Sequence, residues 1–170
     1  MGSALQLREA RAADADAIAR LVADSFEGYR EFAPEGWEPP SAEAEAKLLE
    51  PLFERPDFWC AVAEHDGGVV GHSAFLPAGS AMSPSGDDGL AHLRALFVDR
   101  EWWGRGVAGR LHLMALEEAA RRGFHAIRLY TPVAQARARR FYEREGWSAA
   151  GEPFESDLGL TLVEYRRDLP

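Results

Sequence analysis

The stretch that decides the fold is Leu93-Arg94-Ala95-Leu96-Phe97-Val98, followed by Asp99-Arg100-Glu101-Trp102-Trp103 and Gly104-Arg105-Gly106-Val107-Ala108-Gly109. Its first part belongs to an apolar segment from Leu90 to Val98 that predicts a strand. Alternation would place Leu93, Ala95 and Phe97 on one face and His92, Arg94, Leu96 and Val98 on the other. After the glycines, an apolar stripe of Val107, Leu111, Met114 and Ala115 predicts a helix to about Arg122, ended by Gly123.

The glycine turn at 104–109 has the chemistry of an anion site. Glycine lacks a Cβ atom, so a phosphate can approach the backbone closely. The first amides of a helix have no internal partner and lie at the positive end of the helix dipole. Arg105 and Arg110 could add charge. The spacing of Gly104, Gly106 and Gly109 also matches the dinucleotide-binding fingerprint Gly-x-Gly-x-x-Gly, although the turn lies late in the chain rather than after a first strand. A tight turn that only lets the helix pack against the strand is the alternative without a ligand.

The rest of the chain alternates between short strands and helices. Strands are predicted at Leu5–Glu9, Phe58–Glu64, Val69–Leu76, Ala126–Tyr130 and Leu160–Arg166. Helices are predicted after caps at Asp14 and Ser41, and over Gln135–Glu145 before Gly146. The turn His65-Asp66-Gly67-Gly68 indicates a hairpin, whereas 28–40 and 77–89 are expected to be irregular. The predicted fold is a single α/β (α+β) domain over residues 1–170, with a mixed, mainly antiparallel central sheet flanked by helices.

Composition narrows the function classes. With 170 residues and a net charge of −9, the chain is expected to bind no nucleic acid, and the acidity favours either a cationic substrate or mere solubility. No apolar run is long enough to cross a bilayer and the first residues lack a signal-peptide pattern, so we expect a cytoplasmic protein with no membrane partner. The single cysteine, Cys60, is expected to be a buried structural thiol rather than an acyl carrier, and no residue spacing suggests a metal site.

Two blocks of the sequence together resemble a known family. The first is Leu96-Phe97-Val98 followed by Trp103-Gly104-Arg105-Gly106-Val107-Ala108. The second is Gln135-Ala136-Arg137-Ala138-Arg139-Arg140-Phe141-Tyr142-Glu143-Arg144-Glu145-Gly146-Trp147. In residue type and spacing they resemble the core of the GCN5-related N-acetyltransferase (GNAT) family. Three positions depart from the family pattern: Trp103 replaces a Gln or Arg, Gln135 replaces an Asn, and His92 replaces the Glu that many relatives have.

The resemblance implies a function and a set of site residues. It implies transfer of an acetyl group from acetyl-CoA to an amine by direct attack in a ternary complex, without a metal. The backbone of Leu96, Phe97 and Val98 would meet the pantetheine arm and the acyl carbonyl, and an amide there would stabilise the oxyanion. Gly104, Arg105, Gly106, Val107, Ala108 and Gly109 would hold the pyrophosphate, and Gln135 would contact the cofactor arm. Tyr142 would protonate the departing thiolate.

The resemblance leaves the base and the acceptor open. His92 stands where many relatives have Glu and is our candidate general base; His72 is its rival, and Glu64 and Glu101 have less support. Tyr29, Phe32 and Trp37 either line an acceptor pocket or form a packed loop. The acceptor is a small-molecule or peptide amine. The oligomeric state is left open, although homodimers are common among similar proteins. Two competing interpretations are a non-catalytic acyl-CoA-binding module and a nucleotide-binding domain.

Overall fold

The computed structural model describes residues 3–170. Its strands are β1 (Gln6–Glu9), β2 (Trp59–His65), β3 (Gly68–Pro77), β4 (Leu90–Val98), β5 (Ala126–Pro132), β6 (Ser148–Glu155) and β7 (Thr161–Asp168). Its α-helices are α1 (Ala15–Glu27), α2 (Ala42–Leu52), α3 (Val107–Arg121) and α4 (Ala136–Arg144). Short 3₁₀ turns lie at η1 (Ala12–Asp14), η2 (Gly28–Glu31), η3 (Ala78–Ser80) and η4 (Arg100–Trp102).

The strands form one sheet in the order β1-β2-β3-β4-β5-β7-β6. Neighbouring strands are antiparallel except β4 and β5, which are parallel. A parallel pair needs a crossover connection, and here α3 supplies it. The predicted mixed, mainly antiparallel sheet is therefore confirmed.

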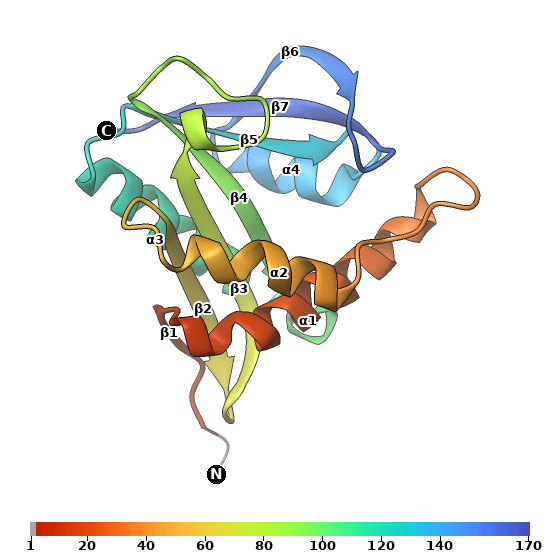
Figure 1. Ribbon diagram of the computed structural model, residues 1–170, viewed down its shortest axis with the longest axis vertical. Helices are drawn as coiled ribbons and strands as arrows, with labels where there is room; N and C mark the ends of the chain where they lie inside the picture. The colour runs from red at the N-terminus through yellow and green to blue at the C-terminus, as the bar shows by residue number, and fades with distance from the viewer. Residues whose placement is uncertain (1–2) are drawn as a thin grey trace.

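Helices cover both faces of the sheet. In Figure 1, α1 and α2 cross in front of β2, β3 and β4, while α3 and α4 lie behind. Each face of the sheet has its own apolar cluster. One packs α3 and α4 on the sheet through Val107, Leu111 and Tyr142. The other packs α1 and α2 on the opposite face through Ile18 and Leu49. Helix α3 packs closely on β3, since a Cβ atom at Gly71 would lie 2.8 Å from Leu111 Cδ1.

Strand β4 contains an irregularity that simple alternation does not predict. Phe75 of β3 pairs with Leu93 and the adjacent Ala74 pairs with Ala95, so Arg94 is an extra residue on β4. A bulge of this kind reverses the side-chain alternation beyond it. Leu93 consequently packs on the α3 side and Ala95 on the α1–α2 side. The expectation that they share a face was wrong.

Other local predictions had mixed outcomes. The Ser41 side chain caps α2, accepting from the Ala44 amide at 3.1 Å, and the predicted hairpin turn has left-handed backbone at Asp66 and Gly67. Asp14 occupies the cap position of α1 but makes no cap hydrogen bond; its carboxylate accepts instead from the Arg8 guanidinium. Strand β6 was not predicted.

Candidate functional site

The centre of the site is an opening between β4 and β5. These strands pair only from Leu90 to His92 and from Ala126 to Arg128. Beyond that point, the edge of β4 from 93 to 98 has no strand partner on its β5 side in the described chain. Backbone groups left free by diverging strands need another hydrogen-bond partner. The opening therefore offers main-chain donors and acceptors to an extended ligand.

The glycine turn stands directly after β4 and begins α3. Gly104 and Gly106 have φ angles of 75° and 79°, a left-handed backbone that favours glycine. The Arg110 amide donates to the Gly106 carbonyl at 3.1 Å, so the amides of Val107, Ala108 and Gly109 precede the first full helical turn. A Cβ atom built on Gly104, Gly106 or Gly109 meets nothing within 4 Å, so there is open space beside each of these three residues. This geometry can hold a phosphate.

Trp103 ties the turn to the strand. Its indole Nε1 donates to the Val98 carbonyl at 2.9 Å. The guanidinium of Arg137 from α4 lies 4.0 Å from the centre of the indole ring, and that of Arg100 lies 5.3 Å from it. Trp103 thus holds the turn against the end of β4, and its hydrogen bond uses one lone pair of the Val98 carbonyl.

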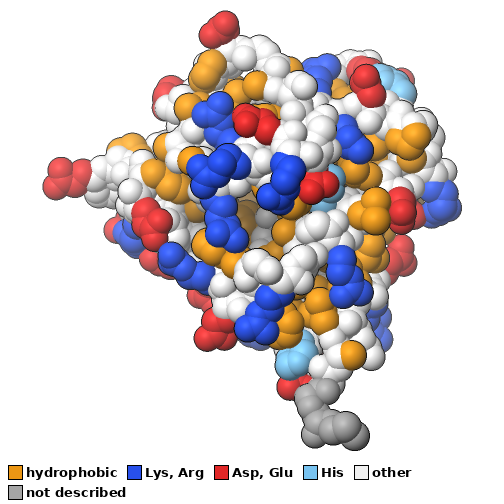
Figure 2. Space-filling view, turned by 180° about the vertical axis from the view of Figure 1, so that it is seen from behind, with side chains coloured by type: hydrophobic (Ala, Val, Ile, Leu, Met, Phe, Trp, Pro, Cys, Tyr) orange, Lys and Arg blue, Asp and Glu red, His pale blue; other side chains and the backbone are white. Residues whose placement is uncertain are grey.

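Positive charge gathers around the turn although the chain is acidic overall. Arg105, Arg110, Arg137 and Arg140, at the starts of α3 and α4, form no ion pair within residues 3–170, whereas most other arginines do. Figure 2 shows Lys and Arg side chains around a hollow on this back face. Unpaired guanidinium groups beside a helix start are suited to several phosphate charges.

Tyr142 lies on α4 with 8% of its surface exposed. Its ring packs edge-on against Phe141 and Trp147, with ring centres 5.4 and 5.6 Å away. Its hydroxyl has no hydrogen-bond partner in the described residues. Burial raises the pKa of the phenol well above its ordinary value, so it carries its proton at neutral pH. The group is suited to donate a proton.

His92 is buried and held by Arg128, the partner opposite it on β5. Arg128 Nε donates to His92 Nδ1 at 3.3 Å, which places the proton of neutral His92 on Nε2. Burial, together with Arg128 and Arg94, lowers the pKa of His92 to about 3. Neither ring nitrogen is then ready to take a proton from an amine. His92 as the general base stays a prediction, and this hydrogen bond argues against it.

Arg128 was not singled out in the sequence. Although only 3% exposed, it donates to three carbonyls of the 78–83 segment, those of Ala78, Met82 and Ser83. It thereby fixes the connection between β3 and β4 next to His92. The available signal was a charged residue inside the apolar strand 126–130, where a side chain is buried only with partners.

Of the remaining candidates, His72, Cys60 and Glu64 already contact other side chains. His72 is fully buried, and its Nδ1 lies 3.5 Å from Cys60 Sγ. Cys60 is buried, which confirms the buried thiol that the sequence predicts, and this burial raises its pKa to about 12. Glu64 accepts from Arg8 at 2.7 Å, and Glu101 is exposed on η4. Gln135 is half-buried at the start of α4.

The aromatic segment after α1 is packed and also reaches the site. The Tyr29 ring lies 4.9 Å from Phe26 and 5.1 Å from Phe32, measured between ring centres. Phe26 in turn contacts Phe97 of β4 at 5.5 Å. Trp37 Nε1 donates to the Leu158 carbonyl at 2.7 Å, which links the segment to the turn between β6 and β7. The cluster therefore borders β4 on the side opposite α3.

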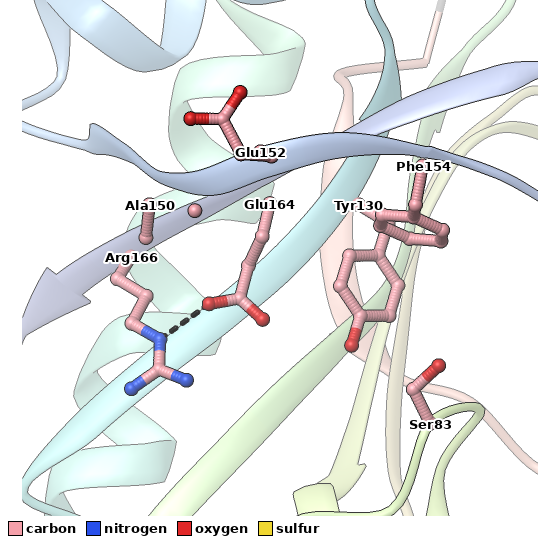
Figure 3. Close-up of a pocket in the computed structure, with 8 residues that line it drawn as sticks. Ser83, Tyr130, Ala150, Glu152, Phe154, Glu164 and Arg166 are labelled. Atoms are coloured by element: carbon pink, nitrogen blue, oxygen red, sulfur yellow. Dashed lines mark hydrogen bonds and ion pairs between the residues drawn. The ribbon is translucent and has the colours of Figure 1, made fainter.

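A second hollow of about 520 Å³ lies beside the opening. Figure 3 shows Tyr130 of β5 pointing toward Ser83, with its ring in an edge-to-face contact with Phe154. On β7, Glu164 forms an ion pair with Arg166. Its charges are largely paired with one another. This hollow offers room for part of a substrate rather than a reactive group.

Residues 3–170 contain no cluster of three or more His, Cys, Asp or Glu side chains arranged to bind a metal ion. No helix in the same range has the length and apolarity needed to span a bilayer.

A family model and curated relatives match this chain. A model of the acetyltransferase (GNAT) family matches residues 18–147. The chain is 30% identical over 166 residues to the uncharacterized N-acetyltransferase YhfO of Bacillus subtilis (strain 168), covering 98% of this chain and 99% of that protein.

Solved structures share the fold at low sequence identity. The protein yncA from Salmonella typhimurium, described with its cofactor acetyl-CoA, superposes with a TM-score of 0.76 at 20% identity, covering 99% of this chain and 95% of that one. The PaiA N-acetyltransferase from Thermoplasma acidophilum, in complex with coenzyme A, gives 0.72 at 16% identity, with 95% and 98% covered.

Proposed function

We propose, from the premise that this chain belongs to the acetyltransferase (GNAT) family, that it transfers an acetyl group from acetyl-CoA to an amine within a ternary complex. The observation that carries the proposal is the junction of the β4–β5 opening with the glycine turn that starts α3. One element offers backbone groups to an extended amide-containing arm and the next offers free amides to a phosphate. We take residues 1–170 as one such catalytic domain.

The residues around the junction fit the parts of acetyl-CoA. The pyrophosphate would bind the amides of 104–109, next to glycines whose Cβ positions meet open space. Arg137, which is in no ion pair, lies over the neighbouring Trp103 ring, and Arg105, Arg110 and Arg140 stand unpaired at the starts of α3 and α4. The pantetheine arm would lie along the free edge of β4 at Leu96, Phe97 and Val98, and Gln135 stands at the facing start of α4. The thioester would then lie deep in the opening, on the same side as Tyr142.

The reaction follows from these groups. A neutral amine attacks the thioester carbonyl, forming a C–N bond, and a β4 amide stabilises the oxyanion. When the intermediate collapses, the C–S bond breaks and Tyr142 gives its phenolic proton to the leaving thiolate. The attacking nitrogen loses its surplus proton to water, and solvent restores the proton of Tyr142. His92 as base is the alternative route for that nitrogen proton.

A thiol-release assay tests the proposal. The purified chain is mixed with acetyl-CoA and a panel of a polyamine, an aminoglycoside, free amino acids and a peptide with a free N-terminus. We expect CoA release that depends on one class of amine, with mass spectrometry detecting the acetylated product. Binding of acetyl-CoA without turnover would favour a non-catalytic module. Tight binding of ADP or NAD without binding of CoA would favour a nucleotide-binding domain.

A further inference from the structure

Trp103 and Arg137 meet across the opening between β4 and β5. The two strands are last paired where His92 faces Arg128, and they diverge from there. Trp103 follows η4 on the β4 side, whereas Arg137 lies in the first turn of α4, after β5. The guanidinium carbon of Arg137 nevertheless lies over the Trp103 ring, 4.0 Å from its centre. A side-chain contact therefore bridges the open end, opposite the end that His92 and Arg128 close.

The Trp103 ring is held in place from its own side of the opening. Its indole Nε1 donates to the Val98 carbonyl at 2.9 Å, and its backbone amide donates to the Arg100 carbonyl at 3.2 Å. The residue nevertheless remains 41% exposed, so its ring is fixed without being enclosed. Arg137 thus stacks on a surface whose position β4 determines.

Arg137 keeps its full charge and its hydrogen-bonding edge. Among residues 3–170 it forms no ion pair, whereas Arg100, the other guanidinium near this ring, pairs with Glu31 at 3.6 Å. A guanidinium that lies over an aromatic ring uses its flat face for that contact. Its N–H groups lie in the guanidinium plane and can donate in pairs to phosphate oxygens. One side chain can therefore stack on the indole and bind a phosphate at the same time.

The stacked guanidinium stands next to the glycine turn. Trp103 is directly followed by Gly104, whose φ of 75° starts the turn, and α3 begins at Val107. The turn offers amides from the β4 side of the opening, and Arg137 offers N–H groups from the α4 side. Donors on two sides suit an anion with several oxygen atoms, such as a pyrophosphate.

An aromatic residue at position 103 holds a cation without neutralising it. The family pattern has Gln or Arg here, but a Gln offers no aromatic face and an Arg would repel Arg137. A carboxylate would hold Arg137 and would also cancel the charge that attracts a phosphate. The departure at Trp103 is therefore matched to the free charge of Arg137.

We propose that Trp103 positions Arg137 so that its guanidinium binds the pyrophosphate of acetyl-CoA from the α4 side, opposite the amides of the glycine turn. This inference rests on the proposed function. Trp103 is a positioning residue, and Arg137 is a further cofactor-binding residue. Because the pair spans the open end, it joins the β4 and α4 sides around the bound cofactor. No covalent bond or proton changes in this step.

The test is a double-mutant cycle on acetyl-CoA affinity, with Kd measured by isothermal titration calorimetry. We expect Kd to rise at least about tenfold in Arg137→Gln, because charge-assisted hydrogen bonds to the phosphate are lost. Trp103→Gln should raise Kd about three- to fivefold, the effect of one exposed cation–π contact. In the Arg137→Gln background the same substitution should change Kd little, because the cation is already gone. A merely structural role of Trp103 would weaken binding equally in both backgrounds.

Two further variants and a second ligand make the test specific. Trp103→Phe keeps the aromatic face and loses the bond to Val98, so its Kd should stay closer to that of the wild type than the Kd of Trp103→Gln does. Arg144→Gln is the matched control, because it removes the same charge at the other end of α4, from a residue that pairs with Glu145, and should leave Kd at the wild-type value. Dephospho-CoA, which keeps the pyrophosphate and lacks the 3′-phosphate, should lose as much affinity in Arg137→Gln as CoA does.

Failure of the inference and failure of its premise give different results. The inference is overturned by an unchanged Kd in Arg137→Gln, or by an equal effect of Trp103→Gln in both backgrounds. A Trp103→Phe variant as weak as Trp103→Gln, or a loss that disappears with dephospho-CoA, would also overturn it. A wild-type protein that binds neither acetyl-CoA nor CoA would overturn the proposed function instead.

Discussion

Helix α3 has a left-handed glycine at each end, and the pair permits a controlled test of the phosphate site. Gly106 precedes the helix with φ +79° and Gly123 follows it with φ +90°, and a Cβ atom at either position meets nothing within 4 Å. Alanine would therefore cost only the backbone strain of a left-handed L-residue, about 1–2 kcal/mol. For a chain of this size, each kilocalorie lowers Tm by about 2–4 °C. Gly106→Ala and Gly123→Ala should thus lose similar stability.

Their effects on acetyl-CoA should differ sharply. At Gly106 the strain is relieved by turning the amides of the 104–109 turn away from the ligand, and each lost charge-assisted hydrogen bond costs about 1.5–3 kcal/mol. We expect the Kd for acetyl-CoA to rise at least about tenfold in Gly106→Ala and to stay near wild type in Gly123→Ala. Isothermal titration calorimetry gives Kd, and differential scanning calorimetry gives Tm. Equal affinities in the two variants would refute the assignment of the turn to the pyrophosphate.

Three further predictions concern catalysis, packing and pH. Tyr142→Phe should lower kcat by about 10²-fold or more with little change in acetyl-CoA affinity, and stopped-time thiol assays with calorimetry will show whether it does. Gly71→Ala should cost about 1–3 kcal/mol in urea unfolding, because the added methyl pushes α3 from β3; an unchanged midpoint would contradict this packing. The pKa values of His72 and His92 are lowered to about 3 and that of His112 to about 4, so unfolding takes up protons below about pH 6.5 and stability falls as pH drops from 7 to 5. His112→Gln should flatten that loss of Tm.

The outline of the fold could be read from the sequence because local signals agreed with tertiary packing. The hairpin turn, the Ser41 cap and the stripe on α3 each depend on neighbouring residues alone. Strand β6 was missed because it is an exposed edge strand with a bulge between Ala150 and Phe154, and its alternation is broken by Gly151 and Pro153. The bulge at Arg94 depends on a pairing between distant strands, so no local pattern announces it.

The site was partly predictable for the same reason. The glycine turn and Tyr142 belong to contiguous motifs, and the structure places them on the α3–α4 side. The environment of His92 was not predictable, since Arg128 lies 36 residues away and becomes its neighbour only when β4 and β5 pair. His92 is a residue type suited to act as a base, but the fold supplies Arg128 as its partner, and that hydrogen bond occupies the ring nitrogen that a base would need.

The position of that partner explains why β4 and β5 separate where they do. His92 and Arg128 form the last paired rung between the two strands. Two residues later, Arg94 binds Glu45 in the α1–α2 layer, and the bulge there places the next residue, Ala95, on the same face. On the β5 side, Arg128 donates to the carbonyls of Met82 and Ser83 as well as to His92, and so holds the two strands together at the point where their pairing ends. The geometry therefore favours a structural role for His92, which holds Arg128 at the closed end of the opening. His92 must be neutral to accept the hydrogen bond from Arg128.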